Sequence, residues 1–126
     1  MTKIQCRLHV TAEWITDYLK SIEAPMQTKN DLLIAPATMP VLFWQYFDIP
    51  WLKRDTAMFH GSQSFSYDEP IVEGMILNCE LSLLKIEKKT GRQGEMTLYT
   101  HSLVCKCRGK RIVTAETVLI QIGDGS

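Results

Sequence analysis

The stretch His60-Gly61-Ser62-Gln63-Ser64-Phe65-Ser66-Tyr67, followed by Asp68-Glu69-Pro70-Ile71-Val72-Glu73-Gly74, decides the fold of this chain. From Phe59 to Tyr67 the residues alternate, so the odd-numbered positions are expected on one face of a strand and His60 and the serines on the other. Gly74 is expected to be a turn residue that needs an unusual backbone conformation. The stretch therefore predicts a strand with one polar face that ends in a turn.

Three more segments with alternating apolar residues follow, at Met75 to about Lys88, Glu95 to Cys107 and Arg111 to Ile122. The apolar phase of the first segment changes near Leu83, which predicts a β-bulge or a strong twist there. Glycine-containing turns separate these segments and predict an antiparallel meander. Because such strands are much longer than the usual length of about five or six residues, we expect a long curved sheet.

Two helices are predicted before this sheet. Thr11 is placed to cap a helix from Ala12 to about Glu23, with apolar residues at helical spacing. Pro40 suits the first turn of a short second helix over Val41–Phe47, in which nearly every residue is apolar. We expect the second helix to pack on the concave face of the sheet, and the remaining sheet surface to be solvated or shared with a second subunit through edge pairing. The chain is therefore predicted to form a dimer.

Length and composition limit the classes of protein to consider. The 126 residues, 45% of them apolar, suit a single domain over 1–126 with one core. Fourteen basic and fourteen acidic residues cancel, so neither a nucleic acid nor an anionic membrane is an expected partner. Three prolines interrupt the longest apolar stretch, Leu32–Leu52, which argues against a membrane span. Because no secretory leader pattern is visible at the N-terminus, we expect a cytoplasmic location.

The cysteines and the short motifs give no sign of a metal, a cofactor or a disulfide. Cys6, Cys79, Cys105 and Cys107 form no Cys-x-x-Cys pair, and Cys105 and Cys107 are expected on the same side of a strand. The thiols are therefore expected to be reduced core residues. The sequence also has no glycine-rich phosphate loop and no nucleophile elbow, so nucleotide and serine-hydrolase roles have no support.

Three motifs carry a resemblance to a known family: Ala35-Pro36-Ala37-Thr38-Met39-Pro40, the strand His60–Tyr67, and Glu69-Pro70-Ile71-Val72-Glu73-Gly74. With these motifs the chain resembles the N-terminal type of MaoC-like dehydratase domain, found in (R)-3-hydroxyacyl-thioester dehydratases and hydratases. The resemblance extends over nearly the whole chain. It implies an α+β hotdog fold, in which a long curved antiparallel sheet wraps around a central apolar helix, and a role in fatty acid metabolism.

The resemblance also implies a ligand, an acyl-CoA or acyl-ACP (acyl carrier protein) thioester bound at a dimer interface. Dehydration of a 3-hydroxyacyl thioester needs a base, an acid and hydrogen-bond donors for the thioester oxygen. Catalytic members supply the acid and base from an Asp and, after four intervening residues, a His, in an Asn-Pro loop beyond the first helix. Here the corresponding loop, Ala24 to Asp31, has no histidine. The catalytic pair of this lyase family is therefore expected to be missing.

Other residues are candidates for catalysis or ligand binding. Asp55 and His60 have the catalytic spacing but lie beyond the second helix and lack the Asn-Pro, so we favour a structural or ligand-lining role for His60. Gly61 would permit close approach of another backbone or a ligand. Gln63 and Tyr67 could form hydrogen bonds with a pantetheine amide. Hydrogen bonds to neighbouring groups of the protein are an equal alternative. The predicted ligand-binding set is thus His60, Gly61, Gln63 and Tyr67, whereas His9 and His101 are expected to be sheet residues.

Three functional hypotheses follow. The preferred one is a noncatalytic or degenerate subunit that shapes an acyl pocket, as a homodimer or as a heterodimer with a catalytic MaoC-like partner. The second is an enzyme in its own right, either a hydro-lyase using Asp55 and His60 or a thioesterase using a carboxylate such as Glu69 or Asp31 to activate water. The third is an acyl-CoA-sensing module, which would need an effector region that this sequence lacks.

Overall fold

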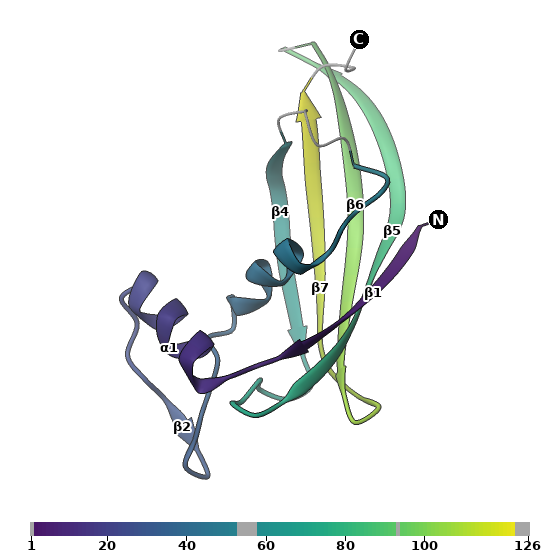
Figure 1. Cartoon of the computed structure of the whole chain (residues 1–126). Coiled ribbons are helices and arrows are strands. Elements are labelled where there is room, and N and C mark those ends of the chain that lie inside the picture. Colours follow the sequence, from purple (N-terminus) through teal and green to yellow (C-terminus); the bar gives the residue numbers. More distant parts are fainter. Residues whose placement is uncertain (1, 53–57, 93, 123–126) are drawn as a thin grey trace.

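The computed structural model describes residues 2–52, 58–92 and 94–122 (Figure 1). The elements follow in the order β1 (Lys3–His9), α1 (Ala12–Ser21), β2 (Thr28–Lys29), β3 (Leu32–Leu33), the 3₁₀ helix η1 (Met39–Tyr46), β4 (Met58–Tyr67), β5 (Ile76–Gly91), β6 (Gly94–Cys107) and β7 (Lys110–Ile122). Five strands form one antiparallel sheet in the order β1-β5-β6-β7-β4, and β2 and β3 form a small hairpin. Both helices lie on the same side of the curved sheet (Figure 1). This is the α+β arrangement expected for a hotdog fold.

The meander prediction is correct for β5, β6 and β7 and wrong for β4, which pairs with β7 instead of β5. The segment between β4 and β5 makes no tight hairpin. At its start the Asp68 N–H donates to the Ile112 carbonyl (2.8 Å), and at its end the Gly74 N–H donates to the Val10 carbonyl (2.8 Å). These bonds lead the chain past the end of the sheet, so β4 and β1 become its two edges.

The bulge predicted near Leu83 is confirmed, because the register of β5 against β6 shifts between Leu83 and Lys85. The turn between β6 and β7 is also as expected. Arg108 and Gly109 both have positive φ, +53° and +79°, as the tight turns of twisted hairpins require. Gly74 has a φ of +90°, which confirms its unusual conformation.

The predicted face assignment within β4 is wrong at its start. The register against β7 shifts at Gly61, which makes this residue a bulge. One extra residue inverts the alternation, so His60 lies on the same face as Gln63, and Phe59 lies on the opposite face with 56% of its surface exposed. A Cβ on Gly61 would lie 2.7 Å from Ile120 Cδ1. The glycine therefore does permit a close approach, and the approaching group is a side chain.

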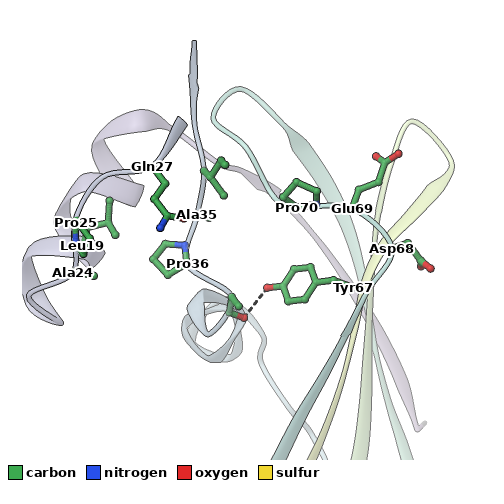
Figure 2. A pocket seen from close by; sticks show the side chains of 12 residues that line it. Leu19, Ala24, Pro25, Gln27, Ala35, Pro36, Tyr67, Asp68, Glu69 and Pro70 are labelled. Carbon is green, nitrogen blue, oxygen red and sulfur yellow. Dashed lines mark hydrogen bonds between the residues drawn. The ribbon is translucent and has the colours of Figure 1, made fainter. Parts of the chain in front are cut away.

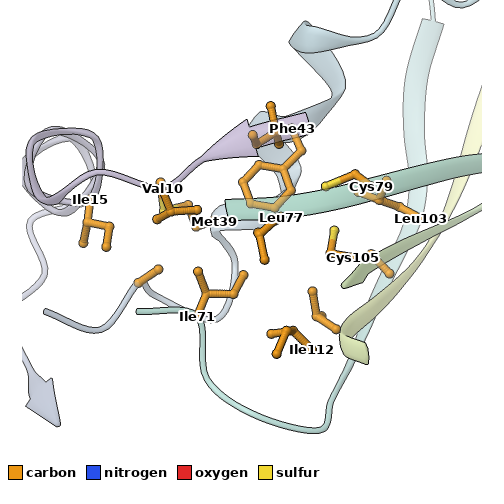
Figure 3. Packing of buried hydrophobic residues seen from close by; sticks show 14 of the residues in the cluster. Val10, Ile15, Met39, Phe43, Ile71, Leu77, Cys79, Leu103, Cys105 and Ile112 are labelled. Atoms are coloured by element: carbon orange, nitrogen blue, oxygen red, sulfur yellow. The ribbon is translucent and has the colours of Figure 1, made fainter. Parts of the chain in front are cut away.

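Helix α1 begins as predicted, because the Thr11 hydroxyl accepts a hydrogen bond from the Trp14 N–H at 3.1 Å. The second helix is present but is 3₁₀ in type. Its Phe43 is fully buried and contacts the Trp14 ring, with 5.5 Å between centroids. Figure 3 shows the core that forms between the helices and the sheet, which includes Val10, Ile15, Met39, Phe43, Ile71, Leu77, Leu103 and Ile112. Neither helix in the described residues has the length and apolar character that crossing a bilayer requires.

Candidate functional site

A cavity of about 540 Å³ opens where the end of α1 and the segment after it face the end of β4 (Figure 2). Its volume is within the range of small-molecule sites, about 300–1,000 Å³. One wall comes from the α1 side and the other from the end of β4 and the following turn. Most lining residues are apolar, and the whole set is Leu19, Ala24, Pro25, Gln27, Ile34, Ala35, Pro36, Ala37, Tyr67, Asp68, Glu69 and Pro70. The cavity therefore suits a ligand with an apolar body.

Two of the motifs behind the family resemblance lie side by side at this cavity. The Ala35 N–H donates to the Ile71 carbonyl (2.8 Å), and the Glu73 N–H donates to the Leu33 carbonyl (2.9 Å). The Glu73 carboxylate in turn accepts from the Leu33 N–H (2.8 Å). These bonds hold the segment after β3 against the turn after β4, which fixes the spacing of the cavity walls.

Tyr67 spans the two walls. Its hydroxyl donates to the Ala37 carbonyl at 2.7 Å, as the dashed line in Figure 2 shows. Burial, with a smaller contribution from the nearby Cys105, raises the pKa of Tyr67 above its ordinary value. The phenol therefore stays protonated at neutral pH and acts as a donor. Of the four predicted ligand-binding residues, Tyr67 alone lines this cavity.

The two carboxylates on the cavity wall are both engaged by cations. Arg111 Nε donates to Asp68 Oδ2 at 2.6 Å, and this hydrogen bond holds the pKa of Asp68 below its usual value. Lys110 forms an ion pair with Glu69. On the opposite wall, the Ala24–Asp31 loop contributes the polar side chain of Gln27. None of its lining residues is an acid or a base. Among the described lining residues, there is thus no carboxylate–histidine pair for acid–base catalysis.

A second polar feature lies farther along β4 on the inner face of the sheet. Gln63, Thr117 and His101 lie opposite one another on β4, β7 and β6. Thr117 and His101 are buried, with 1% and 0% of their surface exposed. Neither amide atom of Gln63 has a hydrogen-bond partner within the described residues, and the same holds for the Thr117 hydroxyl. We call these three residues the buried polar row.

Two tryptophans cover the histidine of this row. Trp51 Nε1 donates to His101 Nε2 at 2.9 Å, and the two rings stack with 5.9 Å between centroids. The Trp44 ring meets His101 edge-on at 4.9 Å. Burial lowers the pKa of His101, so its neutral form, which accepts the Trp51 hydrogen bond, is favoured. This confirms the expectation that His101 is a sheet residue with a packing role.

The predicted ligand-binding residues do not form one site. A strand advances about 3.3 Å per residue, so His60 and Tyr67 lie roughly 20 Å apart along β4. His60 is exposed and Gln63 belongs to the buried polar row. Asp55 lies outside the described residues, so its relation to His60 stays a prediction.

The two carboxylates considered for a thioesterase differ in position. Glu69 lines the cavity, where it is paired with Lys110. Asp31 lies in the β2–β3 turn with a φ of +64°, is exposed, and does not line the cavity. Glu69 is therefore the only one of the two that a cavity ligand could contact directly.

The cysteines have no catalytic or metal-binding arrangement. Cys6, Cys79 and Cys105 lie opposite one another on β1, β5 and β6, and all four cysteines are free. Burial raises the pKa of the Cys6 thiol to about 12, and a hydrogen bond with Cys105 and burial raise the pKa of Cys79. Protonated thiols are poor nucleophiles. In the described part of the chain, no three His, Cys, Asp or Glu side chains are placed to hold a metal ion.

The sequence did not predict the cavity wall after α1 or the contact between Trp51 and His101. The second of these joins residues 50 positions apart, and residue periodicity carries no signal for it. The sequence did indicate one part of this wall, because Ala35-Pro36-Ala37 belongs to one of the three motifs that carry the family resemblance. The contact of that motif with the turn after β4 depends on the fold.

Comparison with known proteins places the chain in a family. Residues 4–115 match the model described as "FAS1-like, dehydratase domain region". A UPF0336 protein of Thermobifida fusca (strain YX) is 29% identical over 98 residues, which is 73% of this chain. The chain covers 62% of that curated relative, less than two thirds of its length.

Solved structures support the same fold. A chain of the C-terminally truncated HadBC (3R-hydroxyacyl-ACP dehydratase) complex from Mycobacterium tuberculosis matches with a TM-score of 0.78 and 15% identity, over 94% of this chain and 93% of that one. A MaoC-like dehydratase matches with a TM-score of 0.77 and 20% identity, over 98% of this chain and 42% of that one. The chain therefore belongs to the FAS1-like dehydratase-domain-region family and has the hotdog fold of MaoC-like dehydratases.

Proposed function

We propose that this chain is a noncatalytic subunit of a 3-hydroxyacyl-thioester dehydratase, which binds the acyl thioester and pairs with a catalytic MaoC-like subunit. The observation that carries the proposal is the composition of the cavity wall. The loop after α1, where catalytic relatives would supply an acid and a base, contributes only Ala24, Pro25 and Gln27 to the lining. Both carboxylates on the opposite wall are engaged by Lys110 and Arg111.

The cavity suits an acyl thioester in shape and chemistry. Its apolar lining would hold an acyl or pantetheine chain, and Gln27 would offer one donor and one acceptor to an amide of the pantetheine arm. The name of the HadBC complex, a 3R-hydroxyacyl-ACP dehydratase, supports this ligand class. The acyl chain would be buried without being activated, because both carboxylates on the described walls are paired with cations and no histidine lines the cavity.

The edge strand β4 is the surface we assign to the partner subunit. It has ten residues and lies at the edge of the sheet, so one side of its backbone is free to pair. Edge strands that stay unpaired are usually protected by charged residues, by proline or by a β-bulge. β4 contains no charged residue and no proline, and its one bulge lies near its start at Gly61. The opposite edge, β1, carries Lys3 and Arg7. We therefore propose that β4 pairs with a strand of a second hotdog subunit.

Ligand binding is tested with the substitution Ala37→Trp, which adds an indole at an exposed position on the cavity wall. Calorimetric titration with octanoyl-CoA should show binding to the wild type and much weaker binding to Ala37→Trp. Thr28→Trp is the matched control, because Thr28 is also exposed, does not line the cavity and lies outside β4. Equal binding by both variants would remove the cavity from the proposal, and no binding to the wild type would refute thioester binding.

Subunit pairing is tested with the double substitution Ser62→Lys/Ser64→Lys on β4. Sedimentation should show a dimer for the wild type, alone or with a catalytic partner, and a shift to monomer for the lysine variant. Gln5→Lys on the other edge is the control and should leave the dimer intact. A wild type that stays monomeric with every catalytic partner tested would contradict the pairing.

A further inference from the structure

The buried polar row is separate from the cavity and has no part in the proposed function. Gln63 on the edge strand β4 lies opposite Thr117 on β7, and Thr117 lies opposite His101 on β6. The residues that line the cavity all lie elsewhere in the chain. The row therefore needs an explanation of its own.

Three polar atoms of this row have no hydrogen-bond partner within the described residues. They are Nε2 and Oε1 of Gln63 and Oγ1 of Thr117. All three atoms are shielded from solvent, and only 1% of the Thr117 surface is exposed. A buried polar group without a partner destabilises the folded state, and native proteins nearly always supply one. Three such atoms on two facing residues point to a bound molecule.

The two side chains are near enough to share one partner. Directly opposite residues of an antiparallel strand pair have Cβ atoms about 4.5–5.5 Å apart. The Gln63 amide and the Thr117 hydroxyl nevertheless form no hydrogen bond with each other. Polar groups that face each other beyond hydrogen-bond distance are commonly bridged by a third, small group.

His101 does not take part in this bridge, because both of its ring nitrogens are engaged. Trp51 Nε1 donates to Nε2 at 2.9 Å, and Nδ1 lies 3.1 Å from the Tyr99 carbonyl oxygen. Donation by Nδ1 to that carbonyl and acceptance by Nε2 describe one neutral tautomer. The bound molecule is therefore expected at the Gln63 and Thr117 end of the row.

The chemistry of the row selects a neutral guest. An amide and a hydroxyl face the guest, and the adjacent imidazole is neutral, so no charge of the row would stabilise a buried ion. The amide nitrogen donates, the amide oxygen accepts and the hydroxyl does both. The guest must therefore both donate and accept hydrogen bonds.

The guest must also be small. Five hollows formed by described residues, the cavity included, have other linings and do not reach Gln63, Thr117 or His101. A buried water molecule needs far less space than such a hollow and typically makes about three hydrogen bonds to polar groups of the protein. The three unpartnered atoms of the row meet this requirement.

We propose that at least one ordered water molecule binds between Gln63 and Thr117. It joins the amide to the hydroxyl, donating to one and accepting from the other. The water thereby ties the inner face of the edge strand β4 to β7, within the strand whose free edge is assigned to the partner subunit. This inference does not depend on thioester binding.

The first test is the sign of the stability change in urea unfolding of Thr117→Val, which replaces the hydroxyl with a methyl group. If a water is bound, the variant loses a hydrogen bond, and the equilibrium constant for unfolding should rise about fivefold. A row without water predicts the opposite sign, because the variant then removes an unsatisfied group. Thr114→Val, on the same strand at a partly exposed position, is the matched control and should change the constant little.

The second test counts buried water directly, by oxygen-17 magnetic relaxation dispersion of the whole chain in solution. Thr117→Val and Gln63→Met/Thr117→Val should each lack at least one long-lived water that the wild type holds. An equal count in the wild type and the variants, or a Thr117→Val protein more stable than the wild type, would overturn the inference. A crystal structure that shows a direct bond between Gln63 and Thr117, with no water beside them, would overturn it as well.

Discussion

The hydrogen bond from Trp51 to His101 gives the most specific prediction about the stability of this fold. Trp51→Phe would keep an aromatic ring beside His101 and would remove the indole N–H together with part of the two-ring system. A buried acceptor, Nε2 of a fully buried histidine, would then lose its partner. Leaving such a group unsatisfied costs about 1–3 kcal/mol, so we expect the free energy of unfolding at pH 8 to fall by about that amount.

The same bond makes the effect depend on pH. The pKa of His101 is lowered in the folded state by burial, so acidification below the unfolded value of about 6.5 destabilises the wild type. Protonated Nε2 would also face the Trp51 N–H as a second donor. Trp51→Phe removes that conflict and lets the pKa of His101 rise. The stability gap between wild type and variant should therefore be largest at pH 8 and should narrow towards pH 5.

The assay is urea unfolding at both pH values, with Trp44→Phe as the matched control. The Trp44 ring also contacts His101, but its N–H has no partner within the described residues. Trp44→Phe loses the same ring atoms but no hydrogen bond, so any loss of stability should come from packing alone and should be equal at both pH values. An equal loss of stability in Trp51→Phe at both pH values, or no loss at pH 8, would refute the reasoning.

Three further predictions concern the cavity and its surroundings. Gly74→Ala should lower the free energy of unfolding by about 1–2 kcal/mol in urea titrations, because φ is +90° there; an unchanged midpoint would contradict this conformation. Tyr67→Phe should cost about 1 kcal/mol in the same assay through loss of the bond to the Ala37 carbonyl, and wild-type stability would argue against that bond. Arg111→Gln should raise the pKa of Asp68 towards its ordinary value in a carboxylate NMR titration, and an unshifted curve would show that the ion pair is absent in solution.

Much of the fold could be predicted from local patterns. The long strands, the cap at Thr11, the bulge near Leu83 and the positive φ of Gly74 all follow from residue type and spacing. The pairing of β4 with β7 could not be predicted in this way, because strand order depends on which long-range contacts bury the most surface. The 3₁₀ geometry of η1 could not be predicted either, because a run of apolar residues does not distinguish a 3₁₀ helix from an α-helix.

The candidate site was predictable only in part. Tyr67 lines the cavity, so its predicted role in ligand binding stays a prediction, and a single bulge at Gly61 reversed the predicted face of His60. The alternation of residue types does not reveal such an inserted residue, because a glycine is compatible with either face of a strand. The burial of Gln63 beside Thr117 also needed the register of two strands that are distant in sequence.

The central claim, that the chain holds an acyl thioester without transforming it, is tested most directly by one measurement. The purified chain is assayed spectroscopically for hydration of crotonyl-CoA and longer enoyl-CoA substrates, with His60→Ala in parallel and octanoyl-CoA binding measured on the same samples. We predict thioester binding with no hydration by either protein. Hydration by the wild type that is lost in His60→Ala would contradict the claim and make the chain an enzyme in its own right.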